Sequence, residues 1–162
     1  MSTIATSQLD AGPTKAAAHH STAKASRVIP QGDFVDRAYG LLIDLEDLHR
    51  LTRRYHFEVW GTEERMSKAT PEEVEEIILD ERGATLSRIP RQVYRHFPDF
   101  PRLRRNILLL DPGNGIWLFV MKDNSSYPAL HAPVGPEEVR KVQKLLGLEH
   151  VPAKWYKVPP GS

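Results

Sequence analysis

The chain has 162 residues, with 22 basic and 21 acidic side chains, a formal net charge of +1 and no cysteine. The lack of cysteine excludes disulfides, zinc–thiolate sites and thiol nucleophiles within this chain. The balanced charge predicts no general attraction to nucleic acid or to a membrane surface. The longest apolar run, Ile116–Met121, is far shorter than the roughly 18 residues of a membrane span. We therefore predict a single domain without a membrane partner.

The N-terminal segment, residues 1–32, contains Ser, Thr, Ala, Gly, Pro and Gln, with no aromatic residue and few large aliphatic ones. Such a segment buries too little apolar area to offset the entropy lost on ordering. We therefore predict a disordered tail, a domain over 33–158 and a loose C-terminus over 159–162. The first residues lack the regions of a secretory signal, so we expect a cytoplasmic protein. The Ser, Thr and Ala content of the tail leaves import into an organelle open.

Residues 33–55 have the pattern of one long amphipathic helix. Asp33 is a good N-cap, and basic residues at the end of the segment suit the helix dipole. Apolar residues recur at intervals of three and four: Phe34, Ala38, Leu41, Leu45, Leu48 and Tyr55. The same stripe would suit a coiled-coil dimer, but Gly40 and additional apolar positions favour packing against a core. Residues 56–61 then alternate between apolar and polar, as in a strand.

Two further helices have clear start and stop signals. The first is predicted over 71–82: Thr70 is its N-cap, proline and glutamate follow as in a capping box, and Gly83 can end it. The second is predicted over 136–146, again beginning with Pro-Glu-Glu and ending at a glycine. Between them, residues 84–105 contain three prolines, which break any long helix.

Residues 107–110 and 116–121 are apolar at every position and flank a turn rich in Asp, Pro, Gly and Asn. This pattern predicts a hairpin over 107–121. Continuous apolarity indicates that both faces are covered, so we expect two central strands. Residues 154–158 predict a short edge strand guarded by lysines. Together these elements predict an α+β fold: a small, mainly antiparallel sheet built on a central hairpin and packed by three helices.

The segment from residue 88 to residue 105 is rich in arginine, with one acid, no lysine, and Tyr94, Phe97 and Phe100 interleaved. Its arginines are Arg88, Arg91, Arg95, Arg102, Arg104 and Arg105. Guanidinium groups bind phosphate and carboxylate in a bidentate manner, and aromatic rings stack on bases. The segment therefore predicts a face that binds either nucleic acid or an acidic protein. A competing interpretation pairs these arginines with residues 63–82, which hold eight acids against three bases.

Two classes of function follow. The first is a non-enzymatic interaction module that uses the arginine-rich face, with a homodimer through helix 33–55 or the hairpin also compatible. The alternative is a small enzyme or ligand-binding domain with an aromatic pocket between the sheet and the first helix. Its predicted lining is Tyr55, His56, Trp60, Trp117 and His131. We identify no cofactor, metal site or catalytic residue. The absence of a catalytic motif favours the interaction module.

One grouping has the residue types of a serine hydrolase. Asp123, Ser125, Ser126 and His131 fall within nine residues of each other. A serine nucleophile needs a base oriented in three dimensions and an oxyanion hole beside it. The sequence predicts neither, so the grouping is a weak hypothesis.

Overall fold

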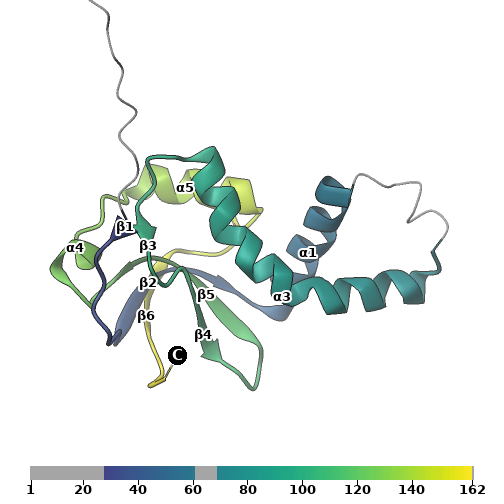
Figure 1. Cartoon of the computed structure of the whole chain (residues 1–162), viewed down its shortest axis with the longest axis horizontal. Coiled ribbons are helices and arrows are strands. Elements are labelled where there is room, and N and C mark those ends of the chain that lie inside the picture. The colour runs from purple at the N-terminus through teal and green to yellow at the C-terminus, as the bar shows by residue number, and fades with distance from the viewer. Residues whose placement is uncertain (1–27, 61–68, 162) are drawn as a thin grey trace, which may run out of the picture.

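The computed structural model describes residues 28–60 and 69–161, without the side chains of residues 56–60. Its strands are β1 (Val28–Ile29), β2 (Arg37–Ile43), β3 (Arg102–Leu103), β4 (Ile107–Asp111), β5 (Ile116–Asp123) and β6 (Lys154–Lys157). Its helices are α1 (Leu45–Trp60), α3 (Pro71–His96), α4 (Tyr127–Leu130) and α5 (Pro136–Leu146) (Figure 1). Four strands form an antiparallel sheet in the order β4–β5–β2–β6, and β1 pairs with β3 in parallel. The α+β fold with a mainly antiparallel sheet is confirmed.

The predicted helix over 33–55 is wrong in its first half. Residues 37–43 form β2, a central strand between β5 and β6. The helix begins only at Leu45, where the Asp44 side chain accepts a hydrogen bond from the Asp47 backbone N–H at 2.8 Å. Apolar residues on both faces of a central strand also satisfy a helical period. Because the helix over 33–55 is not continuous, the apolar stripe that would suit a coiled-coil dimer is interrupted.

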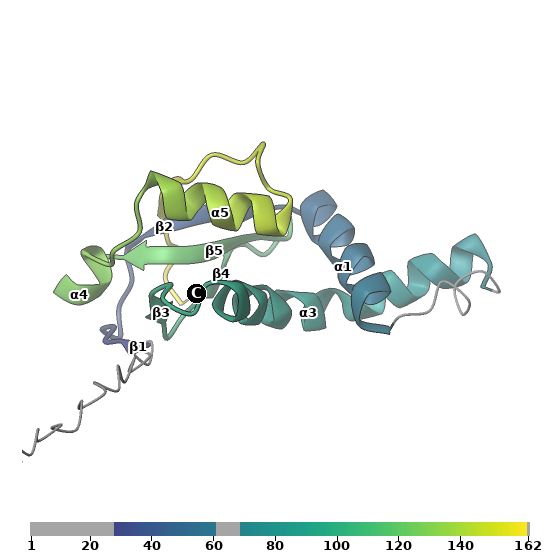
Figure 2. The ribbon, with the colours of Figure 1, turned by 90° about the horizontal axis from the view of Figure 1, so that it is seen from above.

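The predicted strand over 56–61 is also wrong as far as Trp60, because α1 continues to that residue. The alternation of apolar and polar residues there is local, whereas a helix that is already nucleated extends at little cost. The N-terminal half of α3 runs beside α1, and the two helices project from the sheet as an arm in both views (Figures 1 and 2). No helix in the described ranges is long and apolar enough to span a membrane.

Helix α3 begins as predicted but ends much later. The Thr70 hydroxyl accepts the Glu73 N–H at 3.2 Å, and the Glu73 carboxylate accepts the Thr70 N–H at 2.8 Å. The helix then passes Gly83 and Pro90 and ends at His96. Pro90 lacks the N–H of the usual helical bond, and the two halves of α3 run in different directions (Figure 1). Burial of neighbours such as Ile89 holds this second half on the sheet.

The predicted hairpin is confirmed, with Ile107 opposite Phe119 and Leu109 opposite Trp117. Strand β5 is central as expected, but β4 is an edge strand, which corrects the prediction that both are central. Continuous apolarity reports that the two faces of a strand are covered; it does not report that both of its edges are paired. The C-terminal helix is confirmed at 136–146, and β6 forms the opposite edge as predicted.

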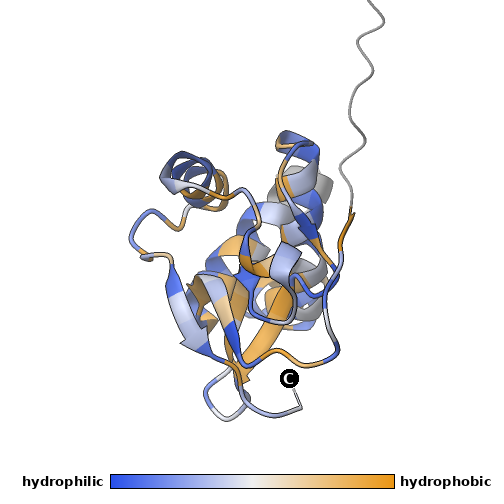
Figure 3. Cartoon of the chain, turned by 90° about the vertical axis from the view of Figure 1, so that its left-hand side faces the viewer, coloured by the Kyte–Doolittle hydropathy of each residue, from blue (hydrophilic) through white to orange (hydrophobic). Residues whose placement is uncertain are grey.

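The three long helices pack on one face of the sheet. Leu41 and Phe119 on that face are fully buried among side chains of α1, α3 and α5. A second cluster on the other face joins Leu118 and Val120 to Leu103 of β3 and Val158 beyond β6. Apolar residues accordingly concentrate in the central strands (Figure 3).

The structure describes only the end of the segment predicted as a tail. Residues 1–27 lie outside the described residues, whereas Val28–Ile29 form β1 against β3. Gln31 is tied at both ends of its amide: its Nε2 donates to the Asp123 carboxylate, and its Oε1 accepts the Arg105 N–H at 2.7 Å. Residues 28–31, within the predicted tail, therefore contact the end of β5 and the segment from β3 to Arg105.

Candidate functional site

Three of the six predicted arginines are engaged within the molecule. Arg88 Nη1 lies 3.5 Å from Glu81 Oε2 on the same helix. The Arg102 guanidinium carbon lies 5.0 Å from the centre of the Tyr94 ring, which is a cation–π contact. Arg105 Nη2 donates to the main-chain oxygen of Asp33 at 2.8 Å. These contacts fix the end of α3, β3 and the segment before β2 relative to one another.

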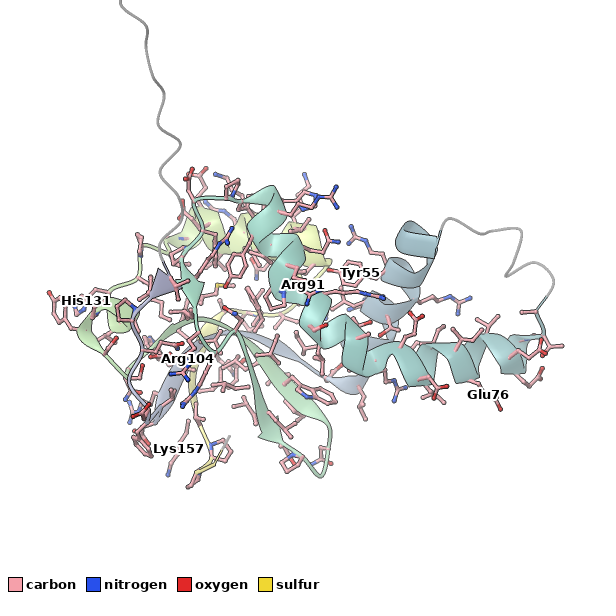
Figure 4. The ribbon with its side chains drawn as sticks, in the orientation of Figure 1. Tyr55, Glu76, Arg91, Arg104, His131 and Lys157 are labelled. Atoms are coloured by element: carbon pink, nitrogen blue, oxygen red, sulfur yellow. The ribbon has the colours of Figure 1, made fainter. Side chains whose placement is uncertain are left out.

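The other three arginines, Arg91, Arg95 and Arg104, are exposed. None of them forms an ion pair or a side-chain hydrogen bond with another residue in the described part of the chain. Arg91 and Arg95 lie one turn apart on α3, and Arg104 lies between β3 and β4 (Figure 4). Their guanidinium groups are therefore available to a ligand. We call these three residues the arginine face.

A groove of about 510 Å³ lies between the second half of α3 and the start of β4. Its lining includes Leu86, Ser87, Pro90, Arg91, Tyr94 and Ile107. Within it, the Tyr94 hydroxyl donates to the Asn106 side-chain oxygen. Burial raises the pKa of Tyr94 to about 12, so this phenol stays protonated and remains a donor at neutral pH. The groove thus has an apolar base and a free guanidinium, that of Arg91, on its wall.

The aromatic residues of the arginine-rich segment do not form a platform for bases. Phe100 is only 4% exposed and stacks on Phe119 in the core, with 6.4 Å between ring centres. Tyr94 is covered by Arg102 on its face. Phe97 is half-buried and packs against the main core. The predicted stacking role therefore has no exposed aromatic ring among these residues, because the rings serve the core and the cation–π contact.

One acid of α3, Glu75, pairs with α1 and not with the arginine-rich segment. Glu75 lies 3.4 Å from His49 Nε2 and 3.8 Å from Arg53 Nη1. Among described residues, the ion pair between Arg88 and Glu81 joins the two oppositely charged segments. Residues 63–68, which carry part of the predicted acidic segment, lie outside the described residues. Internal pairing therefore accounts for Arg88 and leaves the arginine face uncovered.

The described residues of the alternative aromatic pocket do not form one pocket: Tyr55 and Trp117 belong to the main core cluster, apart from His131. Tyr55 is buried in the core, and His131 follows α4 at the opposite end of the molecule (Figure 4). Trp117 lies on β5, while the side chains of His56 and Trp60 fall outside the description. A hollow of about 490 Å³ does lie between the end of α3 and α5, lined by other residues. Its polar groups have local roles: the His96 ring contacts the Gln92 carbonyl, and Glu138 accepts the Gly135 N–H.

The serine hydrolase grouping has no catalytic geometry. The Ser125 hydroxyl donates to Asp123, and the Ser126 hydroxyl accepts the Ala129 N–H as the cap of α4. His131 Nδ1 contacts the Tyr127 carbonyl at 3.0 Å and stacks on the Tyr127 ring. The hydroxyls therefore hold turns, and the imidazole binds its own helix. No group of three His, Asp or Glu side chains within the described ranges is arranged to hold a metal ion.

Sequence reasoning missed the polar and apolar groups that shape the groove. Asn106 is a single polar residue between the arginines and the apolar run, and Ser87 is a single serine within α3. Neither residue belongs to a sequence motif, because they come together only through the way in which α3 crosses β4. Comparison with protein-family models, curated proteins and solved structures finds no match to this chain.

Proposed function

We propose that this protein is a non-enzymatic interaction module that binds an acidic segment of a partner protein through Arg91, Arg95 and Arg104. The observation that carries the proposal is the exposure of these three guanidinium groups without a carboxylate partner among the described residues. Among the acids of the same helix, Glu75 pairs with α1 and Glu81 pairs with Arg88. Arginine is favoured where planar, bidentate contacts to carboxylate are needed.

An acidic protein fits this surface better than a nucleic acid does. Single-stranded nucleic acids gain much of their affinity by stacking bases on exposed aromatic rings. The rings of Tyr94 and Phe100 are occupied by Arg102 and Phe119. The groove beside Arg91 is in contrast lined by Leu86, Pro90 and Ile107, which suit the apolar residues of a peptide. Carboxylates of the same peptide would reach Arg91, which lines the groove.

The proposal is tested with a labelled oligo-glutamate peptide, titrated by fluorescence anisotropy at low and at physiological salt. We expect binding that weakens with salt, because exposed charges are screened. Replacing Arg91, Arg95 and Arg104 together with Ala should weaken binding about tenfold or more. The free energy of unfolding of this triple variant should change by no more than about 0.5 kcal/mol per site, because exposed residues without partners contribute little to folding.

A matched control removes the same charge elsewhere. Arg140, Lys144 and Lys157 are exposed on α5 and on the far edge of the sheet, so their replacement with Ala should preserve peptide binding. Equal loss in both triple variants would reduce the interaction to net charge and overturn the proposed face. A single-stranded oligonucleotide that binds under the same conditions, while the peptide does not, would replace the protein partner with a nucleic acid.

A further inference from the structure

We propose that the acidic segment binds as an added β-strand along the outer edge of β4, an inference that rests on the proposed function. The sheet has two edges, and β4 forms the one beside the groove. Strand addition supplies affinity through main-chain hydrogen bonds, while side-chain pockets supply specificity. The proposal thus names both the binding mode and the conformation of the partner.

The free edge of β4 presents unpaired backbone groups. The Val120 N–H donates to the Asn106 carbonyl at 2.8 Å, so Asn106 faces β5. In an antiparallel pair, successive residues direct their N–H and C=O groups alternately toward the neighbour and away from it. Ile107 and Leu109 therefore direct these groups outward. An extended peptide alongside β4 would find two donors and two acceptors in strand register.

No charged side chain or proline guards the middle of this edge. The strand reads Ile-Leu-Leu-Leu-Asp, and Leu109 is 37% exposed. Exposed apolar edges promote pairing with other chains, and proteins normally protect them with lysine, proline or a bulge. The irregular register between Leu109 and Asp111 disturbs only the end of the strand. The open edge is thus suited to a partner strand.

The groove lies directly beside this edge, because Ile107 belongs to both. An added strand would place alternate side chains toward α3, where Leu86 and Pro90 offer apolar contact and Arg91 offers charge. Arg104 lies three positions before the first residue of β4 and would meet the peptide at that end of the strand. The position of the arginines therefore favours carboxylates on the incoming strand.

Two other occupants fit the charge less well. The chain's own residues 1–27 contain one acid, Asp10, against Lys15, Lys24 and Arg27, so they would meet the arginine face with like charge. A second copy paired edge to edge through β4 would bring two arginine faces close together, which is also repulsive. An acidic segment of another protein avoids both conflicts.

Two peptides of equal charge test the inference. One alternates Glu and Val over about ten residues, a length typical of a long strand. The other has the same sequence with every backbone nitrogen methylated, so it has no N–H with which to form a ladder in either register. We expect the unmethylated Glu-Val peptide to bind the full chain about tenfold more tightly. Equal affinities that both fall in the Arg91, Arg95 and Arg104 variant would overturn strand addition while supporting the arginine face. Failure of both peptides to bind would overturn both proposals.

Amide hydrogen exchange provides a readout that needs no variant. The Ile107 and Leu109 amides should exchange rapidly in the free protein and slow by about tenfold or more when the Glu-Val peptide saturates it. The outward amides of β6 are the matched control. The Val158 N–H bonds to the Asp36 carbonyl of the chain leading into β2, so by alternation the N–H groups of Trp155 and Lys157 point away from β2. Their exchange rates should not change when the peptide binds. Unchanged exchange at Ile107 and Leu109 would overturn the inference. Protection already present in the free chain, together with a dimeric mass, would assign the edge to a second copy instead.

Discussion

The two edges of the sheet differ in how they are protected from pairing with another chain. Strand β6 reads Lys-Trp-Tyr-Lys, with exposed lysines at both of its ends. Strand β4 reads Ile-Leu-Leu-Leu-Asp and carries its charge only at the last position. Lysines on an edge make it costly to desolvate and so prevent pairing with another chain. The contrast supports the proposal that β4, and not β6, accepts a partner strand.

The edges also differ in how the rest of the chain holds them. The connection into β6 is fastened by polar contacts: Gln143 Nε2 donates to the Val151 carbonyl at 2.6 Å, and His150 Nε2 lies 3.1 Å from Asp47 Oδ1. Strand β4 is instead held by side-chain packing, with Leu108 buried against β5 and β3. Packing leaves the outer backbone of β4 uncommitted, which is what strand addition requires.

The largest expected effect comes from removing the packing beneath β4. Phe119 is fully buried, lies opposite Ile107 and stacks on Phe100. Phe119→Ala should lower the free energy of unfolding by about 3–5 kcal/mol, because it removes apolar contact and leaves a cavity. Urea denaturation followed by circular dichroism measures this loss. A variant of near-native stability would mean that β4 is held by something other than this packing.

A smaller effect should follow from exchanging the guards of the two edges. Leu109→Lys gives β4 the protection of β6 and should slow aggregation near the melting midpoint, with stability changed by no more than about 1 kcal/mol. The converse variant, Lys154→Val with Lys157→Val, should speed aggregation. Light scattering at fixed temperature measures both. If the two variants aggregate at the same rate, the difference between the edges has no bearing on association.

The parts of the fold that could be predicted are those written in short-range signals. The capping box of Thr70 and Glu73, and the αL conformation of Gly147 at the end of α5, depend on a few adjacent residues. The region around Leu41 could not be read this way, since a strand buried on both faces and a helix stripe share its apolar positions. The edge position of β4 depends on strand order, which is set by contacts distant in sequence.

The candidate site was predicted in composition but not in arrangement. The arginine count singled out the segment that holds the proposed site, yet it did not distinguish free groups from engaged ones. Arg105 bonds to Asp33, 72 residues away, and Arg102 covers a tyrosine of the preceding helix. Only the fold separates these two from Arg91 and Arg104. The groove was not predicted, because its two walls belong to elements whose crossing no local pattern encodes.

The smallest expected effect concerns the polar contacts that hold the connection into β6, and how their contribution to stability depends on pH. The Asp47 side chain is buried beside Asp44, Arg50 and His150. Burial, with the nearby Asp44 carboxylate, raises the pKa of Asp47 above its ordinary value of 3.8, against the lowering effects of Arg50 and His150. The folded protein therefore holds this proton more tightly than the unfolded chain does. The resulting stabilisation is fully present below the unfolded pKa and is lost as pH rises through the raised, folded pKa.

Asp47→Asn removes this titration. We therefore expect the stability of the unmodified protein, relative to Asp47→Asn, to rise as pH is lowered from neutral toward 3.8. Urea denaturation of both proteins across this range measures the difference. Asp44→Asn is the control: asparagine still caps α1 but removes the neighbouring carboxylate that raises the Asp47 pKa, so the pH dependence should shrink while the helix remains. If the stability of the unmodified protein relative to Asp47→Asn instead falls as pH is lowered, the ion pairs of Asp47 with Arg50 and His150 outweigh the effect of burial. The connection into β6 is then held most strongly when Asp47 is charged.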